Sequence, residues 1–284
     1  MIRPAVAGDE ALIEGFLQGH PNSSMFLRSN LATAGIGNLD HPHGTQFLLQ
    51  MRRGALIGVF GLTNEGYAMC QAPEAEAEDW ATFMRAMAGR SVSGLTGPDA
   101  QVLQAIEALG VAAEAFSVNH AEPLYRLELD QLVPHEGTIR APETLDVDLL
   151  TFWFLAYGKD TGIYTGDNAA EWAIGRAVNA IKGDLTRLLI ADGRPVAMTA
   201  FNARFADMVQ IGGVFTPEDR RGKGYGRRVV AAHLAEVRAE GVKTAILFSN
   251  NDAASRAYEA IGFQRVGSYR VAVSKKPAEI GSRS

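Results

Sequence analysis

The chain has 284 residues, of which 47% are hydrophobic and 21% are charged, and its net charge at pH 7 is −5. At about 150 residues per domain this length predicts two domains, and the negative charge argues against nucleic acid as a partner. No stretch of the sequence approaches the roughly 20 apolar residues of a membrane span, and the N-terminus lacks the apolar run of a signal peptide. The single cysteine, Cys70, excludes an intramolecular disulfide. We therefore expect a cytoplasmic protein with no membrane partner.

The first half of the sequence alternates between helical and strand-like patterns. Two helices are expected first, at residues 9–17 and 24–34, and then three strands, at 46–51, 55–62 and 66–71. A helix at 79–88, a strand at 92–95, a helix at 99–108 and a strand at 124–129 complete this half. Arg52, Arg53 and Gly54 are typical of a hairpin turn between the first two strands.

A stretch at residues 131–143, with two prolines, a glycine and no apolar periodicity, is typical of an interdomain linker. After it the same order of elements recurs: helices at 145–156 and 169–181, and strands at 185–191, 195–202 and 208–215. A helix at 224–240, a strand at 244–249, a helix at 253–261 and a strand at 263–273 follow. The halves also begin alike, with Ile2-Arg3-Pro4 and Ile139-Arg140-Ala141. We interpret the chain as two copies of one α+β unit, spaced by about 137 residues, with domains at 1–132 and 133–284.

The two halves differ most at the turn between the third strand and the next helix. In the second half, Gly222, Gly224 and Gly226 alternate with side chains, and a run of apolar residues at helical spacing follows them. Backbone N–H groups at a helix N-terminus lack intrahelical partners and lie at the positive end of the helix dipole. Such a turn favours a phosphate or pyrophosphate, and five basic residues surround it: Arg220, Arg221, Lys223, Arg227 and Arg228.

Other readings of this turn fit less well. A P-loop requires GxxxxGK[ST], and a dinucleotide fingerprint requires GxGxxG; the turn matches neither. The plain alternative is a helix-capping turn that binds nothing, for which one glycine would suffice. The corresponding turn of the first half, residues 72–79, is acidic and has no glycine, so it cannot hold an anion in the same way.

Three segments carry a resemblance to a known family. Residues 221–226 (RGKGYG) resemble the R/Q-x-x-G-x-G/A signature of the GCN5-related N-acetyltransferase (GNAT) superfamily. Residues 213–217 (GVFTP) resemble the splayed fourth strand of that family, and residues 251–263 (NDAASRAYEAIGF) resemble its N-x-x-A/S…Y-x-x-x-G-F segment. The resemblance covers residues 139–273. It implies two GNAT-like units, each a mixed, mostly antiparallel sheet flanked by helices, with the first half as a degenerate copy.

The resemblance also implies roles for individual residues. The acyl donor would be acetyl-CoA, with its pyrophosphate on the loop and the start of the helix (Arg221, Gly222, Lys223, Gly224, Tyr225, Gly226 and Arg227). Its pantetheine arm would pair with the backbone of Val214 and Thr216, and Val214 or Phe215 would donate an N–H to the thioester oxygen. Asn251 would contact the pantetheine region, and Tyr258 would protonate the departing thiolate, since phenols titrate near pH ~10.

Each of these side chains also has a structural interpretation. Tyr258 fits a core aromatic residue, and Asn251 fits a helix N-cap. The general base is not identifiable, because the strand at 208–215 has Gln210 where family members often have a glutamate; Asp207 and Glu171 are the remaining candidates. The aromatic residues after the linker are expected mostly in the core, although some could border an acceptor pocket: Phe152, Trp153, Phe154, Tyr157, Tyr164 and Trp172. The pair His41 and His43 lacks a third ligand nearby, so no metal site is expected.

The leading hypothesis is transfer of an acetyl group from acetyl-CoA to a primary amine, on a small molecule or a peptide, by a monomer or homodimer. A second hypothesis is a non-catalytic acyl-CoA sensor or interaction module, which the missing strand carboxylate favours and Tyr258 disfavours. A third is aminoacyl transfer of the kind seen in peptidoglycan-bridge enzymes. Those enzymes usually lack an intact CoA loop, so the loop at residues 221–226 argues against it.

Overall fold

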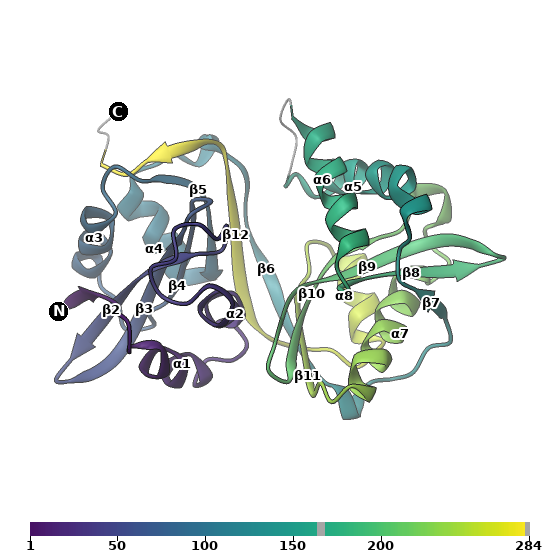
Figure 1. Cartoon of the computed structure of the whole chain (residues 1–284), viewed down its shortest axis with the longest axis horizontal. Helices are drawn as coiled ribbons and strands as arrows, with labels where there is room; N and C mark the ends of the chain where they lie inside the picture. Colours follow the sequence, from purple (N-terminus) through teal and green to yellow (C-terminus); the bar gives the residue numbers. More distant parts are fainter. Residues whose placement is uncertain (164–167, 282–284) are drawn as a thin grey trace. The chain divides into compact units, whose positions relative to one another are not determined.

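The structure is a computed structural model that describes residues 1–163 and 168–281. The chain forms two compact units (Figure 1). The N-terminal unit comprises Met1–Glu122 and the chain from Ser268 onward, and the C-terminal unit comprises Pro123–Gly267. Tyr164, one of the aromatic residues considered for an acceptor pocket, lies outside the described residues.

The N-terminal unit has one sheet in the order β1-β2-β3-β4-β5-β12. Strands β1 to β4 pair antiparallel, β4 and β5 pair parallel, and β12 closes the sheet antiparallel to β5. The elements are β1 (Ile2–Pro4), α1 (Glu10–Gln18), α2 (Met25–Ala34), β2 (Thr45–Arg52), β3 (Ala55–Thr63), β4 (Tyr67–Gln71), α3 (Ala77–Ala86), β5 (Ser91–Pro98), α4 (Asp99–Leu109) and β12 (Gln264–Glu279).

The C-terminal unit repeats this plan with the order β7-β8-β9-β10-β11-β6. Strands β7 to β10 pair antiparallel, β10 and β11 pair parallel, and β6 is antiparallel to β11. The elements are β6 (Phe116–Glu128), β7 (Thr138–Arg140), α5 (Val147–Thr161), α6 (Ala169–Lys182), β8 (Thr186–Ala191), β9 (Arg194–Phe205), β10 (Met208–Phe215), α7 (Tyr225–Ala239), β11 (Thr244–Phe248) and α8 (Asp252–Glu259). The predicted fold class, a mixed and mostly antiparallel sheet flanked by helices in each unit, is confirmed.

The closing strand of each sheet comes from the other half of the sequence. Strand β6 pairs with β11 of the C-terminal unit, from Leu124 opposite Phe248 to Glu128 opposite Thr244. Residues 269–279 of β12 pair with β5 of the N-terminal unit. The compact units therefore do not coincide with the expected boundary between residues 132 and 133. The expected linker at 131–143 also contains β7, which pairs with β8. A three-residue strand is too short to give a periodic signal in the sequence.

One side-chain clamp is repeated in both units at the predicted spacing of 137 residues. Arg3 donates two hydrogen bonds to the Asp9 carboxylate, at 2.7 and 2.8 Å. Arg140 donates two to Asp146, at 2.6 and 2.9 Å. Each clamp ties the first strand of its unit to the start of the following helix. The paired arginine holds the pKa of Asp9 down to about 2 and lowers the pKa of Asp146.

The helices of the C-terminal unit cover both faces of its sheet. Neighbouring strand residues point to opposite faces, and Leu189 packs in the core with α7 and α8 while Leu188 packs in the core with α5 and α6. Trp153 and Phe154 lie in this second core, as expected for most of the aromatic run. The helix that follows β10 therefore starts beside the C-terminal end of that strand, which sets the position of the candidate site.

Candidate functional site

Strands β10 and β11 separate along their length. They pair from Met208 with Thr244 to Ile211 with Leu247, and among the described residues no pairing continues beyond that point. A β-bulge lies in the unpaired half, because Gly212 faces Ala200 whereas Phe215 faces Met198. At the bulge the backbone of Gly213 has φ of +58°. The edge of β10 that faces β11 thus offers backbone groups to a ligand instead of to a neighbouring strand.

The glycine-rich loop links β10 to α7. Gly222 and Gly224 have φ of +78° and +74°, a conformation that side-chain-bearing residues rarely adopt. Gly224 precedes the first residue of α7, Tyr225, and has no side chain that could cap the helix. The first N–H groups of α7 are therefore available to an anion. Gly226 has ordinary helical backbone, and a Cβ added there would lie 3.7 Å from Oγ1 of Thr216.

The basic residues around this loop fall into two groups. Arg220 donates to the carbonyl oxygen of Pro195 at 2.6 Å, and Arg228 donates to that of Glu136 at 2.7 Å. These two side chains hold the loop and the first turn of α7 against neighbouring backbone. Lys223 and Arg227 are exposed and form no ion pair within the described ranges, so they are available to an anionic ligand.

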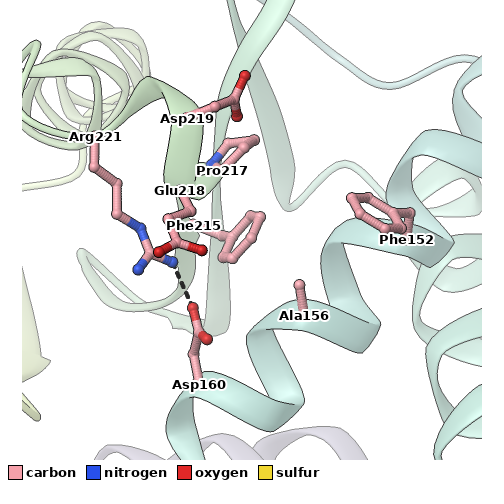
Figure 2. Close-up of a pocket in the computed structure, with 8 residues that line it drawn as sticks. All are labelled: Phe152, Ala156, Asp160, Phe215, Pro217, Glu218, Asp219 and Arg221. Atoms are coloured by element: carbon pink, nitrogen blue, oxygen red, sulfur yellow. Dashed lines mark hydrogen bonds and ion pairs between the residues drawn. The ribbon is translucent and has the colours of Figure 1, made fainter.

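Arg221 joins the loop to α5. Its Nε donates to the carbonyl oxygen of Thr216 at 3.0 Å. Its Nη2 bonds to Asp160 at 2.5 Å (Figure 2). Its guanidinium also lies 5.9 Å from the centre of the Phe215 ring. Asp160 is near the C-terminus of α5, so the ion pair fixes the end of α5 beside the end of β10.

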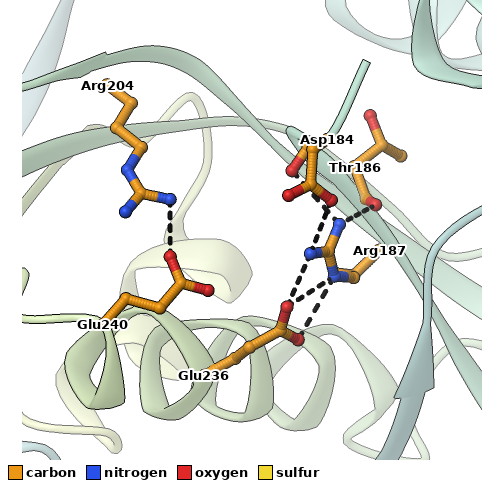
Figure 3. Close-up of polar contacts among 6 residues, drawn as sticks. All are labelled: Asp184, Thr186, Arg187, Arg204, Glu236 and Glu240. Atoms are coloured by element: carbon orange, nitrogen blue, oxygen red, sulfur yellow. Dashed lines mark hydrogen bonds and ion pairs between the residues drawn. The ribbon is translucent and has the colours of Figure 1, made fainter. Parts of the chain in front are cut away.

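Helix α7 is held on the sheet by two further ion pairs. Arg187 of β8 is buried and contacts Glu236 with an Nη2 to Oε1 distance of 2.5 Å, and Arg204 of β9 contacts Glu240 at 2.8 Å (Figure 3). Arg187 also bonds to the backbone oxygens of Asp184 and Thr186. These contacts fix the C-terminal half of α7 and so direct its N-terminus at the separated strands.

Helix α8 forms the opposite wall of the site. The side chain of Asn251 accepts a hydrogen bond from the Ala254 N–H at 2.8 Å, so Asn251 is the N-cap of α8. Tyr258 is 8% exposed and its ring centre lies 6.0 Å from that of Phe263, in an edge-on arrangement. Both residues also line the cavity described next, so neither structural role excludes contact with a ligand.

These elements enclose a cavity of about 790 Å³. Every residue proposed for acyl-donor binding or catalysis lines it, except Lys223, which is adjacent in sequence. Sequence reasoning named Tyr157 of α5 only as a possible part of an acceptor pocket, and it missed Asp160, Thr161 and most of the contributions of α8. The additional lining residues are Tyr157, Asp160 and Thr161 of α5, Arg220 and Asn250 of the loops, and Ala253, Ala254, Arg256 and Ala257 of α8.

A smaller cavity of about 480 Å³ lies on the other side of the Arg221–Asp160 pair. It is formed by Phe152, Ala156 and Asp160 along one face of α5 and by the residues that follow Phe215 (Figure 2). Phe152 is 65% exposed, in contrast to its buried neighbours Trp153 and Phe154. The aromatic run therefore divides between the core, this cavity and Tyr157 in the larger one.

The candidate bases lie away from the larger cavity. Asp207 precedes β10 and forms an ion pair with Lys243 at 3.4 Å; seven residues of strand, roughly 20 Å, separate it from Val214. Glu171 is in the first turn of α6 and lines neither cavity. Gln210 is buried, and its amide donates to the carbonyl oxygen of Ile211 at 2.7 Å. Asp160 is the carboxylate that does line the cavity, and it is engaged by Arg221.

The described residues contain no group of three or more histidine, cysteine or carboxylate side chains placed to hold a metal ion. Among the helices of the described ranges, none is both long enough and apolar enough to cross a membrane.

Separated strands, an open helix N-terminus and a basic loop define the C-terminal unit as a fold that can bind a phosphorylated ligand along a strand edge. Residues 161–263 match the family model described as the acetyltransferase (GNAT) family. That match lies within the C-terminal half of the chain, and it confirms the resemblance to the GNAT superfamily inferred from the sequence for that half.

Solved structures share this fold over almost the whole chain. A Drosophila protein is 15% identical, with a TM-score of 0.63 over 96% of this chain and 98% of its own. A GCN5-related N-acetyltransferase from Sphaerobacter thermophilus is 15% identical, with a TM-score of 0.59 over 100% and 97%. A tandem GNAT protein from the clavulanic acid biosynthesis pathway is 15% identical, with a TM-score of 0.51 over 100% and 99%. No curated protein matches the sequence. At these identities the structures establish the fold, and the family supports acyl transfer in general.

Proposed function

We propose that the protein is an N-acetyltransferase that moves an acetyl group from acetyl-CoA to a primary amine. The observation that carries this proposal is the 790 Å³ cavity, where a free strand edge, an open helix N-terminus and unpaired cations meet. The strand edge suits the amide-rich pantetheine arm of the donor. The helix N-terminus suits its pyrophosphate, and the cations suit the negative charge of its phosphates.

The loop and the first turn of α7 would hold the pyrophosphate. Gly222 and Gly224 turn the backbone so that successive N–H groups face the cavity, and the helix dipole favours an anion at that place. Arg227 would add charge from the first turn of α7. The pantetheine arm would extend along Val214 and Thr216 as an added strand.

The bulge in β10 would place the reacting thioester. The extra residue in the strand turns one N–H, of Val214 or Phe215, out of the ladder with β9. That N–H would stabilise the negative charge that develops on the thioester oxygen as the amine attacks. The carbon–nitrogen bond forms, the carbon–sulfur bond breaks, and the amine releases its proton to solvent.

Tyr258 would supply the proton that the departing thiolate takes up. It lies on α8, across the cavity from β10, and its burial restricts the ring to one wall of the cavity. General acid catalysis of this kind contributes about 10²–10⁴ in rate. The amine would bind in its neutral form, since the carboxylate that lines the cavity is engaged by Arg221. The chemistry requires acetyl-CoA as cosubstrate and no metal ion.

We propose that the N-terminal unit is a degenerate copy that supports the C-terminal unit and binds no acyl-CoA. Its turn after β4 is acidic, and the same clamp and strand order as in the C-terminal unit support a common origin.

A second candidate function is a non-catalytic acyl-CoA sensor. The observation in its favour is Gln210, which is buried and bonded to backbone where related enzymes often carry a carboxylate. A sensor would keep the cavity and lose turnover.

Replacing Tyr258 by Phe separates the two functions. An enzyme should lose turnover by about 10²–10⁴ while its affinity for CoA stays unchanged. Turnover is measured as free thiol released from acetyl-CoA with panels of amines, amino acids, polyamines and peptides, and affinity by calorimetry.

Tyr125→Phe is the matched control. Tyr125 donates to Glu259 at 2.7 Å, next to Tyr258 on α8 but outside the cavity lining. It should keep turnover although it loosens the same helix. Equal turnover of Tyr258→Phe and wild type would reject Tyr258 as the general acid. Absence of turnover in the wild-type protein, with CoA bound, would favour the sensor.

A further inference from the structure

One positively charged side chain that lines the cavity, Arg256, comes from α8 and not from the glycine-rich loop. Arg256 is exposed, lines the 790 Å³ cavity, and its guanidinium makes no hydrogen bond or ion pair in the described part of the chain. An arginine fork that is held by no carboxylate remains available to a bidentate anion.

The surface of α8 next to Arg256 is built from small side chains. Ala253, Ala254 and Ala257 line the cavity from the same helix. Residues three and four apart are neighbours on a helix, so Ala253 and Arg256 lie side by side. Because alanine side chains are small, this face of α8 leaves room for a ligand beside Arg256.

The cavity holds more positive charge than a pyrophosphate requires. Four arginines and one carboxylate line it. Arg220 is bound to backbone and Arg221 to Asp160, which leaves two unpaired arginines. Arg227 lies in the first turn of α7, beside the N–H groups proposed to bind the diphosphate. Arg256 lies on a different helix, so it is placed for a second, separate phosphate group.

Coenzyme A carries such a group. Besides its diphosphate it has a phosphate monoester on the 3′ position of the ribose, with a charge of about −1.5 to −2 at pH 7 as for other phosphomonoesters. We infer that Arg256 binds this 3′-phosphate and makes the site selective for CoA over 3′-dephospho-CoA. This inference rests on the proposed acyl-CoA function and names the part of the donor that α8 recognises.

The test compares CoA and 3′-dephospho-CoA by isothermal titration calorimetry on the full chain. The wild-type protein should bind CoA about tenfold more tightly, the magnitude expected for one charge-assisted contact at a partly exposed site. Arg256→Gln should lower the affinity for CoA about tenfold and leave that for 3′-dephospho-CoA unchanged. Thermal melting of the variant should match the wild type, because the Arg256 side chain is exposed and makes no hydrogen bond or ion pair with the described residues.

Arg265→Gln is the matched control, since Arg265 is an exposed arginine a few residues after α8 that does not line the cavity. It removes the same charge, and both nucleotides should keep their wild-type affinities.

The outcomes separate this inference from the proposed function. If the wild-type protein binds neither nucleotide, the proposed function is wrong. If it binds both equally, the function stands and the 3′-phosphate contact is rejected. If Arg256→Gln lowers the affinity for both nucleotides equally, Arg256 contacts the diphosphate. If Arg265→Gln lowers the affinity for CoA as much as Arg256→Gln does, the effect is one of general charge. Each of these results overturns the assignment.

Discussion

The turns after β4 and β10 occupy the same place in their units and present opposite charge to the helix that follows. In the C-terminal unit Gly224 precedes α7 and leaves its first N–H groups open. In the N-terminal unit Glu76 precedes α3, and Asp79 accepts a hydrogen bond from the Glu76 N–H at 3.0 Å. Carboxylates thus already occupy the N-terminus of α3, where they satisfy the helix and repel an anionic ligand.

The strand edges differ in a corresponding way. Ala72 follows β4, and its N–H donates to Oε1 of Gln101 at 2.7 Å. Gln101 is the third residue of α4, and the third residue of α8 is Ala254, which lines the open cavity. In the N-terminal unit a protein side chain therefore takes the backbone donor that a ligand could use in the C-terminal unit. The comparison indicates that a few residues at the end of one strand decide whether the proposed ligand site is open or closed.

Transferring this glutamine should have the largest effect. We expect Ala254→Gln to lower CoA affinity at least 100-fold, because the new side chain fills the cavity beside α8 and competes for the N–H of Thr216 as Gln101 does for that of Ala72. Calorimetry with CoA measures the loss, and thermal melting should show that the fold is kept, since glutamine is a good helix former.

The reverse change is the control. Gln101→Ala should leave wild-type affinity and add no second CoA site, because the carboxylates at the start of α3 remain. Wild-type affinity in Ala254→Gln would show that the ligand does not run along α8, and a second site in Gln101→Ala would show that Gln101 alone silences the N-terminal unit.

The repeated clamp should give the smallest effect, and it tests what the units share. The pKa values of Asp9 and Asp146 are lowered mainly by hydrogen bonds from Arg3 and Arg140. A group with a lowered native pKa stabilises the fold above its unfolded pKa, about 3.9, and loses that contribution as the pH falls through the native value. For Asp9 the window is pH 4 to about 2.

Asp146→Asn should lower the free energy of unfolding at pH 7 by about 1 kcal/mol, a charged hydrogen-bond contribution discounted for partial exposure. Asp9→Asn removes the same clamp from the N-terminal unit and should also lower the free energy of unfolding. In both variants the difference from wild type should shrink as the pH falls below about 4, as measured by urea unfolding. A difference that is independent of pH would mean that the carboxylates act by shape and not by charge.

Much of the fold followed from local patterns. The order of helices and long strands, the glycine-rich turn and the cap at Asn251 are signals within a few residues, because spacing and turn chemistry determine them. Strands β1 and β7 were missed because three residues give no period. The exchange of β6 and β12 was missed because the choice of a partner strand is made by tertiary pairing.

The site was predictable where it is contiguous in sequence. Residues 214–216 and 221–227 form one stretch, so the loop and its anion chemistry were visible. Asp160 is 61 residues from its partner Arg221, and no local pattern links them. Arg256 was visible in sequence, but an isolated charge on a helix is usually a solvated side chain. Only its position at the cavity beside α8 distinguishes Arg256 from an ordinary solvated arginine.

The most direct test of the central claim is a calorimetric titration of acetyl-CoA into the wild-type chain and into Gly226→Ala. A methyl group at residue 226 meets no closer atom than Oγ1 of Thr216 at 3.7 Å, so the variant should fold and only obstruct the pyrophosphate. We predict that one acetyl-CoA binds per wild-type chain and that its affinity is at least tenfold weaker in Gly226→Ala. Glu78 is the corresponding residue of α3, and Glu78→Ala should bind acetyl-CoA as the wild type does. Absence of binding heat with folded wild-type protein, or unchanged affinity in Gly226→Ala, would contradict a pyrophosphate site at the start of α7.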